Sequence, residues 1–293
     1  MQILASFLER SKPRIFGVLA VFFVLNAFLF ALLGSVEKEA GSVAVLFLDV
    51  GQGDASLVEL GEGVQMLIDG GPPNGRLLAE LGEIMLPYDR TIELVVLTHP
   101  EVDHYGGLIE LLGRYEVGMF IDAGVTKEVE AYEVLVNKLA EYKIRRTTLR
   151  AGDRIRYGGQ VFSIISPDDT LVSAREKNDT SMVLAFESSG ARFLFTGDIG
   201  ANVERIVAKK ITEPFDVLKI AHHGSKFSSA AEFLFAVRPT LAAIGVGKNS
   251  YGHPTRETLA RLETVGARVY RTDRDGTITI RVESGAIRTF VER

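Results

Sequence analysis

The chain has 293 residues, of which 46% are hydrophobic and 24% are charged, and its formal net charge is −5. This composition is typical of a globular protein and excludes collagen-like, disordered and coiled-coil chains. The chain has no cysteine, which excludes disulfides, thiol nucleophiles, iron–sulfur clusters and thiolate metal sites. The negative charge argues against nucleic-acid binding through bulk positive charge.

An apolar segment comes first in the chain. Residues Ile15 to Leu33 are apolar except for Gly17 and Asn26, and this length is close to the roughly 20 residues that cross a bilayer as a helix. Basic residues stand at positions 10, 12 and 14, so the positive-inside rule places the N-terminus in the cytoplasm and the remainder outside. We therefore expect a cytoplasmic N-terminus over residues 1–14, a transmembrane anchor over 15–34, and a linker over 35–42. A cleaved signal peptide and a buried globular helix are the alternatives.

Residues 43–293 predict grouped strands with helices between some of them. The expected strands cover residues 43–49, 56–60, 64–69, 93–97, 119–122, 154–157, 161–166, 181–187, 192–196, 215–220, 241–246, 268–271, 277–282 and 286–291. The expected helices cover residues 74–86, 105–112, 127–142, 201–210, 230–236 and 256–265. This order predicts one α/β domain of two packed sheets with helices on their outer faces, a four-layer αβ/βα sandwich.

The histidines are the most informative residues. The chain has five of them. Each follows a strand-like run or lies in a turn marked by Gly or Pro, and the pattern places none on the apolar stripe of a helix. They are His99, His104, His222, His223 and His253. A single loop histidine is usually structural, but all five at such positions indicate a site of chemistry.

The first cluster directly follows the predicted buried strand 93–97. It combines His99, Glu101, Asp103 and His104 within six residues, at the strand end where α/β layers commonly place functional loops. On an extended segment the first three side chains converge on one side, and a tight turn adds the fourth. Mixed imidazole and carboxylate ligands suit a two-metal hydrolytic site, which polarises an oxygen and lowers the pKa of bound water.

A second carboxylate, Asp198, follows the strand predicted over 192–196 in a Gly-Asp pair. Taken alone, it is read as the N-cap of the helix that starts near Ala201. Together with the histidine clusters it becomes the natural ligand to bridge two metal ions.

Three segments carry a family resemblance. HPEVDHYGG (99–107), FLFTGD (193–198) and LKIAHHGS (218–225), in this order, resemble the metallo-β-lactamase superfamily. DVGQGD (49–54) and NDTS (178–181) narrow it, because they are similar to the C-terminal metallo-β-lactamase-like domain of ComEC-type DNA-internalisation competence proteins. The resemblance covers roughly residues 43 to 283.

The resemblance implies a ligand set for one or two divalent ions. The implied metal-binding residues are His99, Glu101, Asp103, His104, Asp198 and His222, with Asn178 or Asp179 replacing a middle histidine that this chain lacks. Asp69 matches the motif aspartate that supports the site. Because Glu101 and Asn178 or Asp179 stand where histidines are usual, the set is rich in oxygen and favours Mn²⁺ over Zn²⁺.

Further residues are assigned to catalysis and substrate contact. Asp103 and Asp198 are the expected catalytic carboxylates, and His223 or His253 the proton-transfer group. The DVGQGD turn supplies Asp49, Gln52 and Asp54 as substrate contacts, with a plain turn between strands as the alternative. Ser225 and Lys226 are candidates for contacting a phosphate, although Lys226 is equally typical of a solvated surface residue.

These observations predict a single-pass cell-membrane protein whose extracytoplasmic domain is a metal-dependent phosphodiesterase, most specifically a nuclease acting on DNA in uptake or degradation. The DNA substrate rests on the resemblance. One predicted span cannot form a DNA channel, so the chain either has a competence-type channel protein as its partner or only trims or degrades DNA outside the cell. The alternatives are a cell-envelope phosphodiesterase with another substrate and a catalytically lapsed metal-binding scaffold.

Overall fold

The computed structural model describes residues 21–26, 43–283 and 285–293. The described residues from Val43 to Arg293 form one compact unit. Residues 21–26 are helical. No helix within the described residues combines the length and the apolar character that a membrane crossing requires. Of the anchor predicted over 15–34, only residues 21–26 are described. The predicted segments 1–14 and 35–42 lie outside the described residues.

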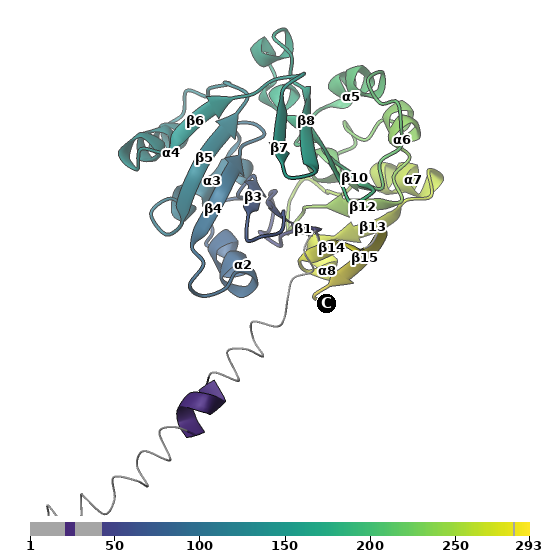
Figure 1. Cartoon of the computed structure of the whole chain (residues 1–293). Coiled ribbons are helices and arrows are strands. Elements are labelled where there is room, and N and C mark those ends of the chain that lie inside the picture. The colour runs from purple at the N-terminus through teal and green to yellow at the C-terminus, as the bar shows by residue number, and fades with distance from the viewer. Residues whose placement is uncertain (1–20, 27–42, 284) are drawn as a thin grey trace, which may run out of the picture. The chain divides into compact units, whose positions relative to one another are not determined.

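The first sheet has eight strands in the order β15-β14-β1-β2-β3-β4-β5-β6 (Figure 1). Its strands are β1 Val43–Phe47, β2 Ser56–Glu59, β3 Gln65–Ile68, β4 Thr91–Val96, β5 Glu116–Asp122, β6 Arg145–Thr148, β14 Ile278–Glu283 and β15 Ala286–Val291. The pairs from β15 to β3 are antiparallel, and those from β3 to β6 are parallel. The parallel strands therefore end at one common edge.

The second sheet has seven strands in the order β13-β12-β11-β10-β9-β8-β7. Its strands are β7 Arg154–Tyr157, β8 Gln160–Ser166, β9 Val183–Ser188, β10 Ala191–Phe195, β11 Val217–Lys219, β12 Leu241–Ile244 and β13 Arg268–Arg271. Strands β10 to β13 run parallel, whereas β7 to β10 are antiparallel. This sheet thus repeats the mixed organisation of the first.

Helices cover the outer face of each sheet (Figure 1). The first sheet packs against α2 Arg76–Ile84, α3 Val102–Leu111 and α4 Glu130–Glu141, and the second against α5 Ala201–Ala208, α6 Ala231–Val237 and α7 Arg256–Thr264. Shorter elements are α8 Thr272–Asp275 and the 3₁₀ turns η1 Leu171–Ser173, η2 Lys177–Thr180 and η3 Ala221–Gly224. The predicted four-layer sandwich is confirmed.

Strand β1 shows why its sequence is a continuous apolar run. All five of its residues are buried, because neighbouring side chains point to opposite faces of the sheet and both faces are covered. Val45 and Phe47 enter the core between the two sheets, while Ala44 and Leu46 enter the core under the helices. Burial on both sides removes the alternation seen in half-exposed strands.

Helix α3 and strand β6 differ from the sequence-based expectation, and the short helix α8 was not predicted. Helix α3 begins at Val102 rather than at Tyr105, so Asp103 and His104 lie in its first turn and not in a loop. Gly107 permits this path, since a Cβ there would lie 2.1 Å from the carbonyl oxygen of Gly70. Strand β6 was not predicted, because its polar side chains are mostly exposed at a sheet edge and carry no apolar pattern.

Candidate metal centre

The centre is built where parallel strands of both sheets end. Asp69 follows β3, His99 follows β4, Asp198 follows β10, and the His222–His223 pair follows β11. The carboxyl ends of parallel strands are where α/β proteins place polar ligand groups. The two sheets thereby bring residues from distant parts of the chain into one buried group.

Four side chains form that group. Asp54, His104, Asp198 and His223 each offer one ligand atom, and these atoms all lie within 4.8 Å of one another. Asp198 is central, because its Oδ2 lies 3.4 Å from Nε2 of His104 and 3.6 Å from Nε2 of His223. All four residues are buried.

Several polar atoms of this centre have no hydrogen-bond partner among the described residues. They are Nε2 of His99, Nε2 of His104 and Oδ1 of Asp54, and each is buried. Buried polar atoms are nearly always satisfied in native proteins, so orphans gathered at one place indicate a missing ligand. Imidazole nitrogens and carboxylate oxygens are the donors that divalent Zn²⁺ and Mn²⁺ accept. The residues therefore fit a divalent metal ion.

Asp69 orients His104 from outside the group. Its Oδ2 lies 2.8 Å from Nδ1 of His104, and it also accepts hydrogen bonds from the backbone and hydroxyl of Thr98, both at 2.8 Å. A carboxylate on one ring nitrogen directs the other nitrogen toward the metal position and raises its basicity. This arrangement agrees with the supporting role expected for Asp69.

The two neighbouring histidines point to different places. Both adopt left-handed backbone conformations, with φ 53 and ψ 43 for His222 and φ 53 and ψ 24 for His223. Nδ1 of His223 lies 2.8 Å from the carbonyl oxygen of Gly245, and its Nε2 lies 3.2 Å from Oδ2 of Asp103. Such backbone conformations cost about 1–3 kcal/mol each and persist where surrounding contacts hold them. Here they place His223, rather than His222, in the buried group.

The charges of the centre stabilise one another strongly. Burial opposes the charged form of His104, but the carboxylates of Asp198 and Asp69 outweigh it and raise the His104 pKa well above its usual range. Against the same opposition, Asp198 and Asp54 raise the pKa of His223 to about 10. The two imidazoles in turn hold the pKa of Asp198 well below its usual value, although burial alone would raise it.

His99 behaves in the opposite way. Burial and the charge of His104 lower its pKa to about 3, so the ring is neutral at pH 7. A neutral imidazole is the form that binds a metal. The ring centroids of His99 and His104 are 4.2 Å apart, which places His99 directly beside the buried group.

Lys219 is a site residue that sequence reasoning missed. Its buried ammonium group, at the end of β11, pairs with Oδ2 of Asp54. Burial opposes ionisation of Asp54, but Lys219 and His223 lower its pKa. Gly245 leaves room for the side chain of Asp54, because a Cβ at position 245 would lie 2.2 Å from Oδ1 of Asp54. The available signal was a lysine inside the otherwise apolar run VLKIA.

The structure gives several predicted residues other partners. Glu101 forms an ion pair with Lys127 and is not one of the four grouped side chains. Asp49 pairs with Arg76 at 3.0 Å and with Arg293 at 3.1 Å. These carboxylates are held by cations of the chain itself, and their predicted roles as metal and substrate contacts stay predictions.

The remaining predicted residues lie around the group. Oε1 of Gln52 accepts a hydrogen bond from the Gly247 backbone at 3.2 Å. Asp179 accepts one from Gly200, also at 3.2 Å. The amide nitrogen of Asn178 lies 3.4 Å from Nε2 of His222, and neither residue is one of the four grouped side chains. Their ligand and substrate roles also stay predictions.

A hollow of about 520 Å³, here called the loop pocket, opens next to the centre. It is lined by His222, Ser225, Lys226, Phe227, Tyr251, Gly252, His253, Thr255, Arg256 and Glu257. The rings of His222 and His253 meet edge to face with centroids 5.7 Å apart. The predicted phosphate contacts Ser225 and Lys226 and the predicted proton-transfer residue His253 thus share one hollow.

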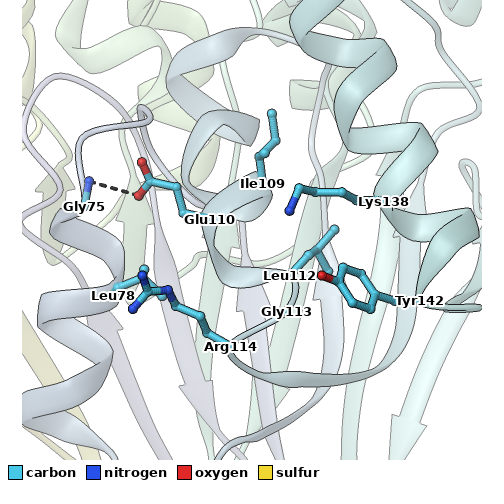
Figure 2. A pocket seen from close by; sticks show the side chains of 9 residues that line it. All are labelled: Gly75, Leu78, Ile109, Glu110, Leu112, Gly113, Arg114, Lys138 and Tyr142. Atoms are coloured by element: carbon cyan, nitrogen blue, oxygen red, sulfur yellow. Dashed lines mark hydrogen bonds between the residues drawn. The ribbon is translucent and has the colours of Figure 1, made fainter.

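A second hollow of about 480 Å³, the helical pocket, lies on the outer helical layer. It is lined by Gly75, Leu78, Ile109, Glu110, Leu112, Gly113, Arg114, Lys138 and Tyr142, which come from α2, α3, α4 and the turns beside them (Figure 2). None of the predicted site residues is among them. Glu110 accepts a hydrogen bond from the Gly75 backbone at 3.0 Å, as Figure 2 shows.

Comparison with protein families decides the assignment. A family model described as "Metallo-beta-lactamase superfamily" matches residues 48–248. The chain belongs to the metallo-β-lactamase superfamily. Members of this superfamily are usually metal-dependent hydrolases, and the buried histidine–aspartate group agrees with divalent metal binding.

One curated relative of this metallo-β-lactamase domain is Competence protein ComA of Neisseria gonorrhoeae, which is 28% identical over 256 residues, covering 86% of this chain and 34% of that protein. The chain is 28% identical over 262 residues to ComE operon protein 3 of Bacillus subtilis, covering 80% of this chain and 33% of that protein. It is 31% identical over 264 residues to Recombination protein 2 of Haemophilus influenzae, covering 88% and 31%. The chain therefore spans about a third of the length of these relatives. The predicted ComEC-type resemblance is confirmed.

Solved structures share the fold. A metallo hydrolase from Ignicoccus hospitalis has a TM-score of 0.54 at 21% identity, covering 80% of this chain and 98% of that one. The metallo-β-lactamase fold protein YhfI from Bacillus subtilis has a TM-score of 0.53 at 12% identity, covering the same shares. At these identities the likeness establishes the fold alone.

Proposed function

We propose that this metallo-β-lactamase domain is a metal-dependent phosphodiesterase that cleaves DNA. The observation that carries the proposal is the buried group of Asp54, His104, Asp198 and His223, whose ligand atoms lie within 4.8 Å of one another. The similarity to Recombination protein 2 and to a competence protein supports DNA as the substrate, as does the sequence resemblance to DNA-internalisation proteins.

The ligands follow from the geometry. His104, Asp198 and His223 would hold a divalent ion, with Asp54 and His99 beside them. Such an ion lowers the pKa of water and stabilises negative charge on phosphoryl oxygens. This mixed set of imidazoles and carboxylates suits Zn²⁺ as well as Mn²⁺.

The side chains of the chain itself have separate tasks. Asp198 fixes both His104 and His223 through its Oδ2. Asp103, whose side chain is 33% exposed, lies between the buried group and solvent and contacts His223. His253 is half-buried on the wall of the loop pocket, and we assign it the proton transfer to a leaving group. Lys226 supplies a positive charge to a phosphate in the same hollow.

The cellular setting completes the proposal. Residues 15–34 anchor the chain in the cell membrane, residues 1–14 stay in the cytoplasm, and the catalytic domain faces outward. A competence-type channel protein is the partner. The charge asymmetry on the two sides of the apolar segment supports this orientation of the chain in the membrane.

A substrate panel tests the reaction. The purified full chain is incubated with Mn²⁺ or Zn²⁺ and single-stranded DNA, double-stranded DNA, or bis-p-nitrophenyl phosphate. We expect metal-dependent DNA cleavage that Asp198→Ala abolishes. Cleavage of the small diester alone would replace DNA by an envelope phosphodiester. Metal binding without any turnover would make the domain a scaffold.

A further inference from the structure

The rim of the loop pocket carries two exposed aromatic side chains. Phe227 is 70% exposed and Tyr251 is 74% exposed, although large aromatic side chains are mostly buried in proteins. Both line the same hollow, and its volume of about 520 Å³ lies in the range of about 300–1,000 Å³ typical of ligand pockets. Two aromatic faces are therefore available to one bound molecule.

A row of rings connects this rim to the buried group. The centroids of Tyr251 and His253 are 5.7 Å apart, and those of His253 and His222 are also 5.7 Å apart. His222 continues to His223 at 6.3 Å, and His223 belongs to the group that fits a metal ion. A molecule in the loop pocket thus lies beside the reaction centre.

The hollow also holds positive charge. Nζ of Lys226 lies 5.1 Å from the centroid of the Phe227 ring, in a cation–π contact. The exposed side chain of Arg256 has no hydrogen-bond or ion-pair partner among the described residues, and Glu257 is the one acidic side chain in the lining. Two cations against one acid favour an anionic ligand, although the whole chain is acidic at −5.

Aromatic faces combined with cations in one groove are how proteins hold single-stranded nucleic acid. The bases stack on the rings and the cations follow the backbone, with little dependence on sequence. A base stacked in this way cannot remain paired, and unstacking a paired base costs a few kcal/mol that a single strand does not require.

We infer that the loop pocket is a base-stacking subsite for an unpaired nucleotide next to the scissile phosphate. Tyr251 and Phe227 supply the stacking faces, and Lys226 and Arg256 neutralise the backbone. The inference rests on the proposed nuclease function and adds to it that the enzyme acts on single strands and unpaired ends.

The test compares two single-stranded oligonucleotides of equal length, oligo-dT and one in which the nucleotides are abasic. Tyr251→Ala in the full chain is expected to raise KM for oligo-dT about 10-fold with little change in kcat, and to leave KM for the abasic strand unchanged. Tyr251→Phe keeps the ring and should resemble the unmodified chain. Tyr88→Ala is the matched control, because Tyr88 is 83% exposed on the loop between α2 and β4.

Binding is measured in parallel by fluorescence anisotropy of labelled oligo-dT in EDTA, so that the subsite is tested without turnover. If no DNA is cleaved but Tyr251→Ala still weakens oligo-dT binding about 10-fold relative to abasic DNA, the nuclease proposal fails and the subsite stands. If DNA is cleaved and Tyr251→Ala changes neither KM nor binding, or affects abasic DNA equally, the subsite is overturned.

Discussion

The loop pocket and the helical pocket have nearly the same volume, about 520 and 480 Å³, but opposite chemical settings. The loop pocket shares His222 and His253 with the surroundings of the buried histidine–aspartate group. The helical pocket contains no histidine, and its Glu110 is already bonded to the Gly75 backbone. Size alone therefore does not identify a site in this molecule.

The two pockets differ chemically because only the loop pocket lies where parallel strands end. The loop pocket is formed by segments that follow β11 and β12, at the edge where the parallel strands end. The helical pocket lies between helices on the outer face of the first sheet. Substitutions at the two places should therefore have very different effects on activity.

The largest effect is expected for Asp198. Asp198→Ala removes the carboxylate that contacts both His104 and His223, and we expect activity to fall by more than the roughly 10–100-fold typical of outer-shell residues. Asp103→Ala should behave similarly. Hydrolysis rates and far-UV circular dichroism are measured together, since the fold should be kept. Full activity in both variants would refute the metallohydrolase assignment.

A smaller loss is expected when the support of His104 is removed. Asp69→Asn should weaken metal binding roughly 10–100-fold, because the ring of His104 loses its orienting carboxylate. Titration calorimetry with Mn²⁺ measures this change. Asp122→Asn is the control, because Asp122 is a buried carboxylate at the end of β5 that pairs with Arg146 instead. Equal losses in the two variants would contradict a specific role for Asp69.

Metal binding should also depend on pH. The pKa of His223 is raised to about 10 and that of His104 well above its usual range, so both rings carry protons at pH 7 when no metal is bound. Bound metal must displace these protons, and affinity should therefore rise with pH and fall below neutrality, by about 10-fold per pH unit for each displaced proton. Proton release on adding metal in weak buffer measures this. Binding that does not change between pH 6 and pH 8 would contradict the prediction.

The smallest effect is expected in the helical pocket. Lys138→Ala removes a half-buried cation that lies 5.8 Å from the Tyr142 ring, and hydrolysis should stay within about twofold of the unmodified chain. A loss of activity in Lys138→Ala as large as that in the variants of the metal centre would contradict the assignment of the site to the loop-pocket side.

Much of the fold was predictable from local pattern. The continuous apolar run of β1 indicates that both of its faces are buried. The amphipathic stripe of α4 indicates that one face of the helix packs on a sheet, and that face buries Tyr132, Leu135 and Leu139. Strand β6 was missed because Arg145 and its neighbours at the sheet edge lack an apolar pattern. Edge strands depend on backbone pairing with a neighbour, which a local pattern does not reveal.

The motifs predicted the residue types of the site, but not every residue that belongs to it. His104, Asp198 and the orienting Asp69 are where the motifs indicate. His222 was the predicted metal ligand, whereas His223 lies in the buried group. This difference depends on two consecutive left-handed residues, and no local rule for non-glycine residues predicts such a turn. Lys219 was missed because its partner Asp54 is distant in the sequence.

The central claim is that the buried group binds a divalent ion and that this ion confers phosphodiester hydrolysis. The most direct test titrates Mn²⁺, and separately Zn²⁺, into metal-free full chain while bound metal and hydrolysis of single-stranded DNA are followed in the same sample. We predict that hydrolysis rises in step with occupancy and that Asp198→Ala shows neither. Hydrolysis that is already complete before metal is added, or that is unchanged in Asp198→Ala, would contradict the claim.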